Sequence, residues 1–217
     1  MSEQSGVENL QREGHPDERI RLVGNVMIDT LKKQVARAAD QPVLSALGLE
    51  QGQYAVVTSH RPSNVDQQET LQGMIRVLID VSRSLPVVFP VHPRTKNRLE
   101  TFGLLQQLQQ ADGVTLLEPL GYLDFLALTS QSKVVVTDSG GLQEESTALE
   151  IPCLTMRENT ERPVTVSEGT SILVGSDAKL LGQQLQAVLN GTYKTGQCPK
   201  LWDGRAAERI VAELMSV

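Results

Sequence analysis

One short segment of this 217-residue chain brings small residues, a hydroxyl and carboxylates together at close spacing. Residues 137–145 read Thr-Asp-Ser-Gly-Gly-Leu-Gln-Glu-Glu and follow the apolar run 134–136. A strand, a tight glycine turn and a helix start, in this order, leave backbone N–H groups without an internal partner. The helix dipole adds partial positive charge at the same point, so the turn is a place for an anion such as a phosphate.

The side chains of this segment fit a phosphate followed by a sugar. Ser139, Gly140 and Gly141 are small enough to let a phosphate reach the backbone amides. Glu144 and Glu145 follow about one helical turn later and supply acceptors for sugar hydroxyls. The segment therefore predicts a nucleotide site. From the glycines alone, an ordinary capped strand-to-helix turn is an equally good interpretation, because short glycine motifs often occur by chance.

Two histidines follow two other predicted strands at the point where each strand ends. His60 comes after the apolar run 54–58, and His92 comes after the run 87–91, each with an arginine one or two residues later. A histidine beside an arginine can bind an anion or transfer a proton near neutral pH. A single such histidine more simply satisfies loop carbonyls. Two of them at the edge that carries the glycine turn favour a functional role.

Two further segments at strand ends hold candidate ligand contacts. Arg157 and Arg162 lie in the charged loop 157–163, where their guanidinium groups could neutralise a diphosphate. A solvated charged loop is the alternative, which composition alone favours. Phe125 begins a predicted helix and either stacks on a base or, as is commoner for an aromatic residue there, packs in the core. Both segments would face the glycine turn only if their strands lie beside it.

Strand-length apolar runs alternate with helical patterns along most of the chain, and these elements must position the segments above. Apolar runs predict strands at residues 20–23, 54–58, 87–91, 114–117, 134–137, 153–156 and 171–174. Helical spacing predicts helices at residues 26–39, 69–84, 96–109, 123–130, 141–149, 178–190 and 205–215. Apolar strands separated by helices form a parallel sheet that is covered on both faces. The predicted fold class is therefore α/β, a Rossmann-like doubly wound parallel sheet whose ligands bind beyond the strands' carboxyl ends.

One large domain accounts for most of the chain. Residues 1–18 carry little apolar content and are predicted to be a linker or helical lead-in, and residues 19–217 are predicted to form the Rossmann-like domain. The N-terminal residues lack a signal-peptide pattern, and no apolar run approaches the ~20 residues of a membrane span. Cys153 and Cys198 are far apart and lack metal or redox spacing. We therefore expect a cytoplasmic protein with free thiols.

Composition argues against several classes of partner. Aromatic residues make up 3% of the chain, too few for a base-stacking surface that binds single-stranded nucleic acid. The formal net charge of -6, without a basic run, argues against nucleic acid and against an anionic membrane. A metal site through His60, His92 and Asp138 lacks any short-range ligand spacing, so no metal is expected.

Six motifs occur in order along the chain. They are Gly24-Asn25-x-x-Ile28-Asp29, Thr58-Ser59-His60-Arg61, Pro90-Val91-His92-Pro93, the segment 137–145, Arg157-Glu158-x-Thr160-Glu161-Arg162-Pro163 and Trp202-Asp203-Gly204-x-Ala206-Ala207-x-Arg209-Ile210. Together they resemble the non-hydrolysing UDP-N-acetylglucosamine 2-epimerases. The resemblance covers nearly the whole chain but only the second half of that family. Since those enzymes have a two-domain fold of the glycosyltransferase B type, this chain is similar to their C-terminal, nucleotide-binding domain.

The resemblance implies a role for each candidate residue. The implied UDP-binding residues are Ser139, Gly140 and Gly141 for the diphosphate, Arg162 near the phosphates, Glu145 for the ribose hydroxyls and Phe125 near the uracil. His60 would be the family's one proposed catalytic residue in this half, and His92 matches a position linked to a second, regulatory UDP-sugar site. Pro62 and Ser63 stand where many members carry a basic residue and a glutamate, which suggests a subgroup.

The activity that the resemblance implies is the interconversion of UDP-N-acetylglucosamine and UDP-N-acetylmannosamine by elimination and re-addition of UDP. No metal or redox cofactor is needed. The proposed acid/base carboxylates belong to the family's N-terminal domain, so we expect this chain, an excised or truncated half, to bind UDP without turnover. The implied partners are UDP, a UDP-N-acetylhexosamine, the missing N-terminal domain and a second copy in a homodimer.

Two alternatives stay open at this point. One is the nucleotide half of a glycosyltransferase of the same fold, against which the Thr160-Glu161-Arg162-Pro163 run argues. The other is a stand-alone nucleotide-binding module that performs no chemistry.

Overall fold

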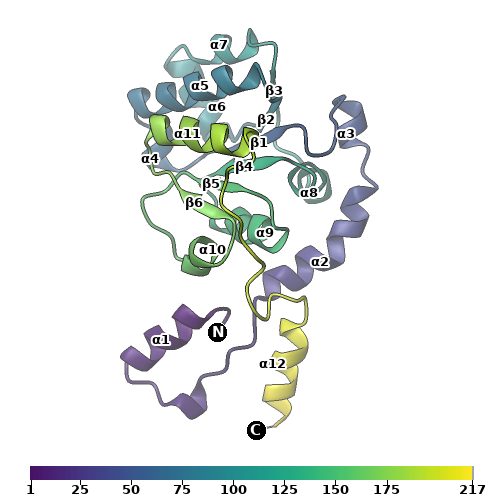
Figure 1. Ribbon diagram of the computed structural model, residues 1–217, viewed down its shortest axis with the longest axis vertical. Helices are drawn as coiled ribbons and strands as arrows, with labels where there is room; N and C mark the ends of the chain where they lie inside the picture. Colours follow the sequence, from purple (N-terminus) through teal and green to yellow (C-terminus); the bar gives the residue numbers. More distant parts are fainter. Residues whose placement is uncertain (217) are drawn as a thin grey trace.

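Six parallel strands form the centre of the structure, a computed structural model that describes residues 1–216 (Figure 1). The strands are β1 (Ala55–Thr58), β2 (Val87–Pro90), β3 (Val114–Leu117), β4 (Val134–Thr137), β5 (Cys153–Thr155) and β6 (Ser171–Leu173). Their order in the sheet is β3-β2-β1-β4-β5-β6, and every neighbouring pair is parallel. Every residue of β2 and β4 is buried, as strands covered on both faces require. The predicted α/β doubly wound sheet is confirmed.

Helices cover both faces of the sheet, as Figure 1 shows. One face carries α5 (Gln68–Ser82), α6 (Pro93–Thr101), α7 (Leu105–Gln109) and α11 (Ala178–Leu189). The other face carries α2 (Val26–Ala39), α3 (Val43–Ala46), α8 (Tyr122–Ser130), α9 (Gly140–Ala148) and α10 (Pro163–Ser167). The short α4 (Pro62–Val65) joins β1 to α5. Each parallel crossover thus returns over one face of the sheet or the other, which makes the fold doubly wound.

The helix predicted at residues 96–109 is two helices, α6 and α7. Gly103 separates them with a φ of +68°, a left-handed conformation that ends helices and that glycine adopts without steric cost. The prediction of one continuous helix was therefore wrong at this residue. The short α3, α4 and α10 were not predicted, because four or five residues carry too little periodicity to stand out.

The two ends of the chain lie together, beyond one end of the sheet (Figure 1). They consist of α1 (Gln4–Arg12) and the 3-10 helix η1 (Asp17–Arg19) on one side and α12 (Ala206–Met215) on the other. The carboxylate of Asp29 in α2 accepts hydrogen bonds from the backbone N–H groups of Ala206 and Ala207, at 3.0 and 2.7 Å, and so caps α12. None of the helices that the structure describes is long and apolar enough to cross a membrane.

The strand predicted at residues 20–23 is wrong. This segment is extended but pairs with no strand of the described sheet. The Val23 N–H donates to the Met1 carbonyl at 3.1 Å, and Ile20 and Val23 line the same shallow hollow as Ile210 and Leu214 of α12. The apolar run therefore packs the lead-in against the last helix instead of extending the sheet.

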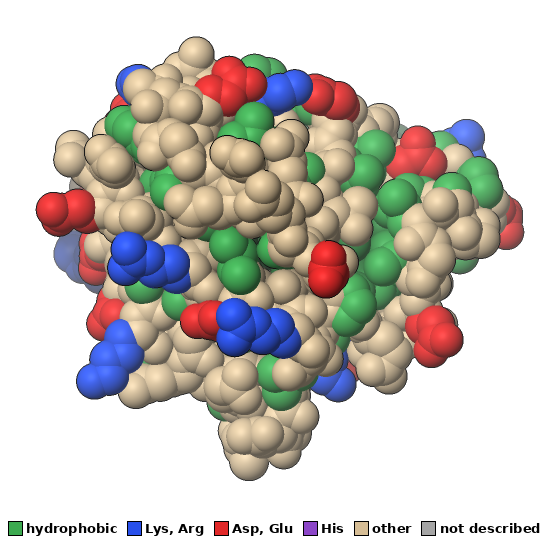
Figure 2. All heavy atoms as spheres, turned by 90° about the horizontal axis from the view of Figure 1, so that it is seen from above, with side chains coloured by type: hydrophobic (Ala, Val, Ile, Leu, Met, Phe, Trp, Pro, Cys, Tyr) green, Lys and Arg blue, Asp and Glu red, His purple; other side chains and the backbone are tan. Residues whose placement is uncertain are grey.

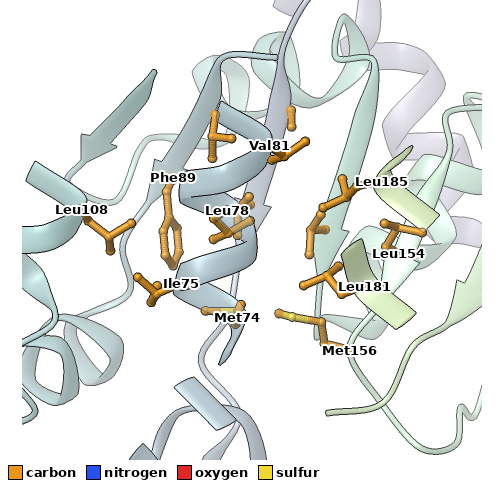
Figure 3. Close-up of a cluster of buried hydrophobic side chains, with 14 of the residues drawn as sticks. Met74, Ile75, Leu78, Val81, Phe89, Leu108, Leu154, Met156, Leu181 and Leu185 are labelled. Carbon is orange, nitrogen blue, oxygen red and sulfur yellow. The ribbon is translucent and has the colours of Figure 1, made fainter. Parts of the chain in front are cut away.

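The largest apolar cluster lies between the sheet and the helix pair α5 and α11. Figure 3 shows Ile75 and Leu78 of α5 beside Phe89 of β2, with Leu154 of β5 and Leu181 of α11 across the cluster. All five are at most 2% exposed, and burying each contributes about 1.5–3 kcal/mol. On the outer surface of these helices, Figure 2 shows acidic and basic side chains interspersed, some of them side by side, and no histidine. The core thus fixes the strands on this side, while the site histidines lie on another face.

Candidate nucleotide-binding site

The strand order places a topological switch point between β1 and β4. From this pair the chain winds outward in both directions, which opens a crevice beyond the carboxyl ends of the two strands. The hydroxyls of the last residues, Thr58 and Thr137, lie 2.7 Å apart and tie the strand ends together. Ser59 and His60 follow one strand, and Asp138 and the glycine turn follow the other. The sheet therefore brings two of the predicted segments to one point.

The glycine turn forms the N-terminus of α9, as predicted. Ser139 is the N-cap, and its hydroxyl accepts a hydrogen bond from the Leu142 N–H at 3.4 Å. The first backbone hydrogen bond from inside the helix runs from the Gln143 N–H to the Ser139 carbonyl, at 3.1 Å. The amides of Gly140 and Gly141 precede it and so have no acceptor within the helix. Two N–H groups with the positive end of the helix dipole therefore face the crevice.

Neither glycine of this turn is required by the fold. A Cβ on Gly140 would approach nothing closer than Nη1 of Arg157, at 3.8 Å, and one on Gly141 nothing closer than Oγ of Ser139, at 4.0 Å. Both contacts are ordinary van der Waals distances, and neither residue has a positive φ. A helix normally loses about 1 kcal/mol for each glycine that replaces alanine. The described fold therefore gives no packing reason for glycine at either position.

Asp138 is fully buried and holds the chain after β1 against the end of β4. Its Oδ2 accepts four hydrogen bonds, from the backbone N–H groups of His60 and Arg61 at 2.8 Å, the Ser59 hydroxyl at 3.1 Å and Nδ2 of Asn64 at 3.0 Å. Its Oδ1 lies 2.9 Å from Nδ1 of His60. The carboxylate thus fixes both the backbone and the imidazole ring of His60.

His60 and His92 lie side by side. Their ring centroids are 5.3 Å apart, with the ring planes tilted by 36°. His92 is the N-cap of α6, and its Nδ1 accepts the Arg94 N–H at 3.1 Å. Both rings line a cavity of about 260 Å³ whose lining residues are Thr58, Ser59, His60, Pro90, His92, Pro119, Leu120, Phe125, Ser139 and Leu142. The two histidines, the N-cap serine and Phe125 therefore share one cavity.

Phe125 both packs in the core and borders the cavity, the two alternatives that its sequence position allowed. Its ring is partly buried and packs against the apolar clusters around Leu128 and Val135, and it also lines the cavity. The outer part of such a ring can contact a flat ligand while the inner part contributes to the core.

The two arginines of the charged loop have different partners. Nε of Arg162 lies 2.6 Å from Oε1 of Glu144, which also accepts from Nδ2 of Asn25 at 2.9 Å. Arg157 instead forms a bidentate pair with Glu161, at 2.6 and 2.8 Å, and its guanidinium borders Gly140. The structure thus places the Arg157 guanidinium beside the glycine turn and the Arg162 guanidinium on Glu144, one turn further along α9.

Arg61 is the second guanidinium at the turn, because its Nε donates to the Asp138 carbonyl at 2.8 Å. The sequence interpretation treated this residue only as the neighbour of His60. Its position directly after β1, next to β4 in the sheet, is the signal that could have identified it.

The two acidic residues of α9 occupy different environments. Burial raises the pKa of the Glu145 carboxyl to about 6, and the charge of Glu144 adds to the increase. Burial also raises the pKa of Glu144, although Arg162 and Asn25 oppose that effect. Glu144 is only 4% exposed and already has both partners, so it belongs to the structure of the protein. Glu145 remains as the acceptor that a ligand hydroxyl could use.

The residues that the structure describes contain no cluster of three metal-ligating side chains. At the one position considered from the sequence, Nδ1 of His92 already accepts the Arg94 N–H. Oδ1 of Asp138 faces His60.

Comparison with known proteins places this geometry in a family. The chain matches the family model for UDP-N-acetylglucosamine 2-epimerase over residues 1–215. It is 36% identical to the UDP-N-acetylglucosamine 2-epimerase of Methanocaldococcus jannaschii, over 94% of this chain and 56% of that protein. It is 33% identical to the UDP-2,3-diacetamido-2,3-dideoxy-D-glucuronate 2-epimerase of Pseudomonas aeruginosa, over 97% of this chain and 57% of that protein.

A solved structure agrees with the sequence matches. The UDP-GlcNAc 2-epimerase of Methanocaldococcus jannaschii, in complex with UDP-GlcNAc and UDP, superposes with a TM-score of 0.83 and 35% identity, over 97% of this chain and 58% of that chain. The chain thus spans a little over half the length of these relatives, as the resemblance to one half of the enzyme implied. With its family match over nearly the whole sequence, this chain belongs to the UDP-N-acetylglucosamine 2-epimerase family.

Proposed function

We propose that this chain is the nucleotide-binding half of a UDP-N-acetylhexosamine 2-epimerase and binds UDP at the N-terminus of α9. The observation that carries the proposal is the pair Gly140 and Gly141. Their amides are free of internal partners, and no contact within the described fold requires glycine at either position. A diphosphate that approaches the backbone accounts for both facts.

The other contacts of UDP follow from the shape of the site. Ser139, Gly140 and Gly141 bind the diphosphate, with Arg157 and Arg61 as the nearest cations. The ribose lies along α9, where the Glu145 carboxylate accepts its hydroxyls. The uracil enters the cavity and contacts the exposed part of the Phe125 ring. Arg162 acts on the nucleotide indirectly. It neutralises Glu144, the residue before the ribose acceptor Glu145.

The chemistry requires UDP to leave the sugar as an anion and to stay bound until it returns. When the bond between the sugar and the diphosphate breaks, the electron pair goes to the diphosphate oxygen. Fixed amide dipoles and the two guanidinium groups stabilise the charge that grows there, so they lower the barrier as well as binding the product. His60 lies on the same edge of the site, with its ring in the cavity beside Ser139, and is the proposed catalytic residue of this half.

Inversion at C2 also needs groups that remove and return the C2 proton from opposite faces. The resemblance assigns carboxylates of the other half of the enzyme to this task, and the chain spans a little over half of its relatives' length. We therefore propose that this chain alone binds UDP without turnover. A coupled assay for UDP-N-acetylmannosamine with the isolated chain checks this, and measurable turnover would contradict it.

The identity of the sugar follows less directly than that of the nucleotide. One relative acts on UDP-N-acetylglucosamine and another on a diacetamido sugar acid carried by the same nucleotide. The proposed contacts in this half address UDP, so the chain itself selects the nucleotide, and the class of UDP-N-acetylhexosamines is proposed from the relatives alone. A second UDP-sugar at His92 stays a prediction, and because His92 is 5.3 Å from His60, it would lie directly beside the first.

Substitution of Gly141 by alanine tests the proposed site. The added methyl group enters space that the protein leaves open, so Gly141→Ala should raise the free energy of unfolding by up to about 1 kcal/mol. The same methyl group blocks the diphosphate and should weaken UDP binding about tenfold or more in titration calorimetry, the loss of one charge-assisted hydrogen bond.

Gly182→Ala is the matched control. Gly182 lies inside α11, where a Cβ would meet Val77 at an ordinary 3.8 Å, far from the site. It should give the same gain in stability with unchanged UDP affinity. Unchanged UDP binding by Gly141→Ala, or no UDP binding by the unaltered chain, would refute the proposal.

A further inference from the structure

The two oxygens of Asp138 have unequal partners. Oδ2 accepts four hydrogen bonds from residues 59–64, whereas the buried Oδ1 accepts none from the described residues and has His60 Nδ1 beside it, at 2.9 Å. An ionised carboxylate accepts hydrogen bonds and donates none. Because Asp138 is fully buried, no water can replace that donor. Oδ1 is therefore satisfied only when the imidazole carries its proton on Nδ1.

This contact determines which nitrogen of His60 faces the cavity as an acceptor. With the proton on Nδ1, neutral His60 leaves the lone pair of Nε2 free. His92 is in the opposite state, because its Nδ1 accepts the Arg94 N–H and its proton must lie on Nε2. The two neighbouring rings are thus opposite tautomers, and only His60 keeps a free lone pair for a ligand.

We propose that Asp138 is a positioning residue that holds His60 in the Nδ1–H tautomer, so that Nε2 exchanges a proton with the bound ligand. The nature of that ligand, a UDP-sugar, rests on the proposed function. The tautomer itself does not depend on the ligand. When Nε2 takes a proton, the Nδ1 proton stays in place, and the positive charge forms 2.9 Å from a buried carboxylate oxygen. When Nε2 gives the proton back, the ring returns to the same tautomer.

The charges around the pair come from three elements. Arg61, on the loop after β1, donates to the Asp138 backbone carbonyl. Arg157, on the loop after β5, has a raised pKa, to which Glu161 contributes most and the nearby charge of Asp138 contributes less. On α6, Nδ1 of His92 accepts a hydrogen bond and leaves that ring uncharged in this geometry. Among residues 1–216, the carboxylate of Asp138 is the one that lies within ion-pair distance of the His60 ring.

Asp138→Asn reverses the proposed arrangement without changing the shape of the side chain. The four donors at Oδ2 require an oxygen there, so the amide oxygen must take that place. The amide NH₂ then replaces Oδ1 and points its hydrogen at Nδ1 of His60. The ring can accept that hydrogen bond only by moving its proton to Nε2, as happens when an aspartate in a Ser-His-Asp triad is replaced by asparagine.

The test is a long-range ¹H–¹⁵N spectrum of the chain labelled at histidine, recorded without UDP at a pH where the rings are neutral. The signals are assigned with the single variants His60→Gln and His92→Gln. In the unaltered protein, His60 should show a protonated Nδ1 and an unprotonated Nε2, and His92 the reverse. In Asp138→Asn, His60 should switch to a protonated Nε2 while His92 stays as it was.

Asp66→Asn is the control. Asp66 lies near the same edge but pairs with Arg94 and Arg98, so it should leave the His60 tautomer unchanged. A protonated Nε2 on His60 in the unaltered protein would overturn the proposal, and this spectrum decides even if Asp138→Asn does not fold. An unchanged tautomer in a folded Asp138→Asn variant would also overturn it.

UDP titrations then separate positioning from simple support of the loop. If Asp138 acts through His60, Asp138→Asn should weaken UDP binding when His60 is present. When His60 is already replaced by glutamine, the same substitution should change UDP affinity by less than about twofold. Equal losses in both backgrounds would show that Asp138 acts independently of the ring. Because the spectra contain no nucleotide, failure of UDP to bind would overturn the proposed function and leave the tautomer result standing.

Discussion

Replacing Glu145 with glutamine should stabilise the protein at alkaline pH and leave its stability unchanged in acid. Glu145 is partly buried in α9 next to Glu144, and burial together with that neighbouring charge raises its pKa from 4.5 to about 6. The folded state therefore binds the proton more tightly than the unfolded state does. The stability that this provides is fully present below pH 4.5 and is lost as the pH rises through 6.

The magnitude follows from the two pKa values. They differ by about 1.5, which corresponds to about 2 kcal/mol. Glutamine is neutral at every pH, so the variant does not lose this free energy in alkali. The difference in the free energy of unfolding, variant minus unaltered protein, should grow by about 2 kcal/mol between pH 4 and pH 8.

Urea denaturation at several pH values measures this difference, with Trp202, the single tryptophan of the chain and only 1% exposed, as the fluorescent probe. Glu69→Gln removes the same charge from an exposed position on α5 and controls for the change in net charge. UDP affinity at pH 8 should fall in Glu145→Gln, since the neutral amide is a weaker acceptor for the ribose hydroxyls. A difference in stability that stays constant from pH 4 to pH 8, or that grows toward acid, would refute the reasoning.

Two further substitutions test contacts around the site. Arg162→Met should lower the free energy of unfolding by about 3 kcal/mol at pH 8, because it leaves the buried carboxylate of Glu144 without its cation. The cost should be smaller in acid, because burial raises the pKa of Glu144 and the variant lacks the cation that opposes this increase, and an equal cost in urea titrations at acid and alkaline pH would contradict this. Gly24→Ala should cost about 3 kcal/mol or more, since Gly24 has a φ of +92° and a Cβ there would lie 2.2 Å from the Leu201 carbonyl oxygen. An unchanged thermal unfolding midpoint in Gly24→Ala would show that the backbone there relaxes.

The sheet was predictable because each of its strands is locally distinct. The valine-rich runs of β2 and β4 are apolar at consecutive positions, which only a strand covered on both faces explains at that length. The run at residues 20–23 has three apolar residues but is interrupted by Arg21, and it packs beside α12, which lies at the other end of the sequence. The arginine is the local difference between this run and the strands that are buried on both faces. The break at Gly103 was visible in the sequence, since glycine commonly follows the end of a helix.

The location of the site was predictable, but its pairwise contacts were not. Strand ends and a glycine turn mark an edge of a parallel sheet without any knowledge of strand order. The pairing of His60 with Asp138 depends on β1 lying next to β4, although 78 positions separate these two residues. The different partners of Arg157, beside Gly140, and of Arg162, on Glu144, depend on the path of one loop. Arg157 follows β5 almost directly, and it reaches the turn because β5 is the neighbour of β4, which the sequence alone does not show.

The residues of α9 show why the nucleotide proposal explains more than a structural role would. Gly140 and Gly141 weaken a helix start that alanine would strengthen, and the ionised Glu145 is disfavoured by its surroundings. Natural proteins retain such locally unfavourable residues where function requires them. The two features also respond differently to pH, because backbone amides do not titrate and Glu145 does. As the pH falls through 6, the ribose contact should therefore weaken while the amide contacts of the diphosphate persist, so uridine should lose affinity at a pH where pyrophosphate still binds.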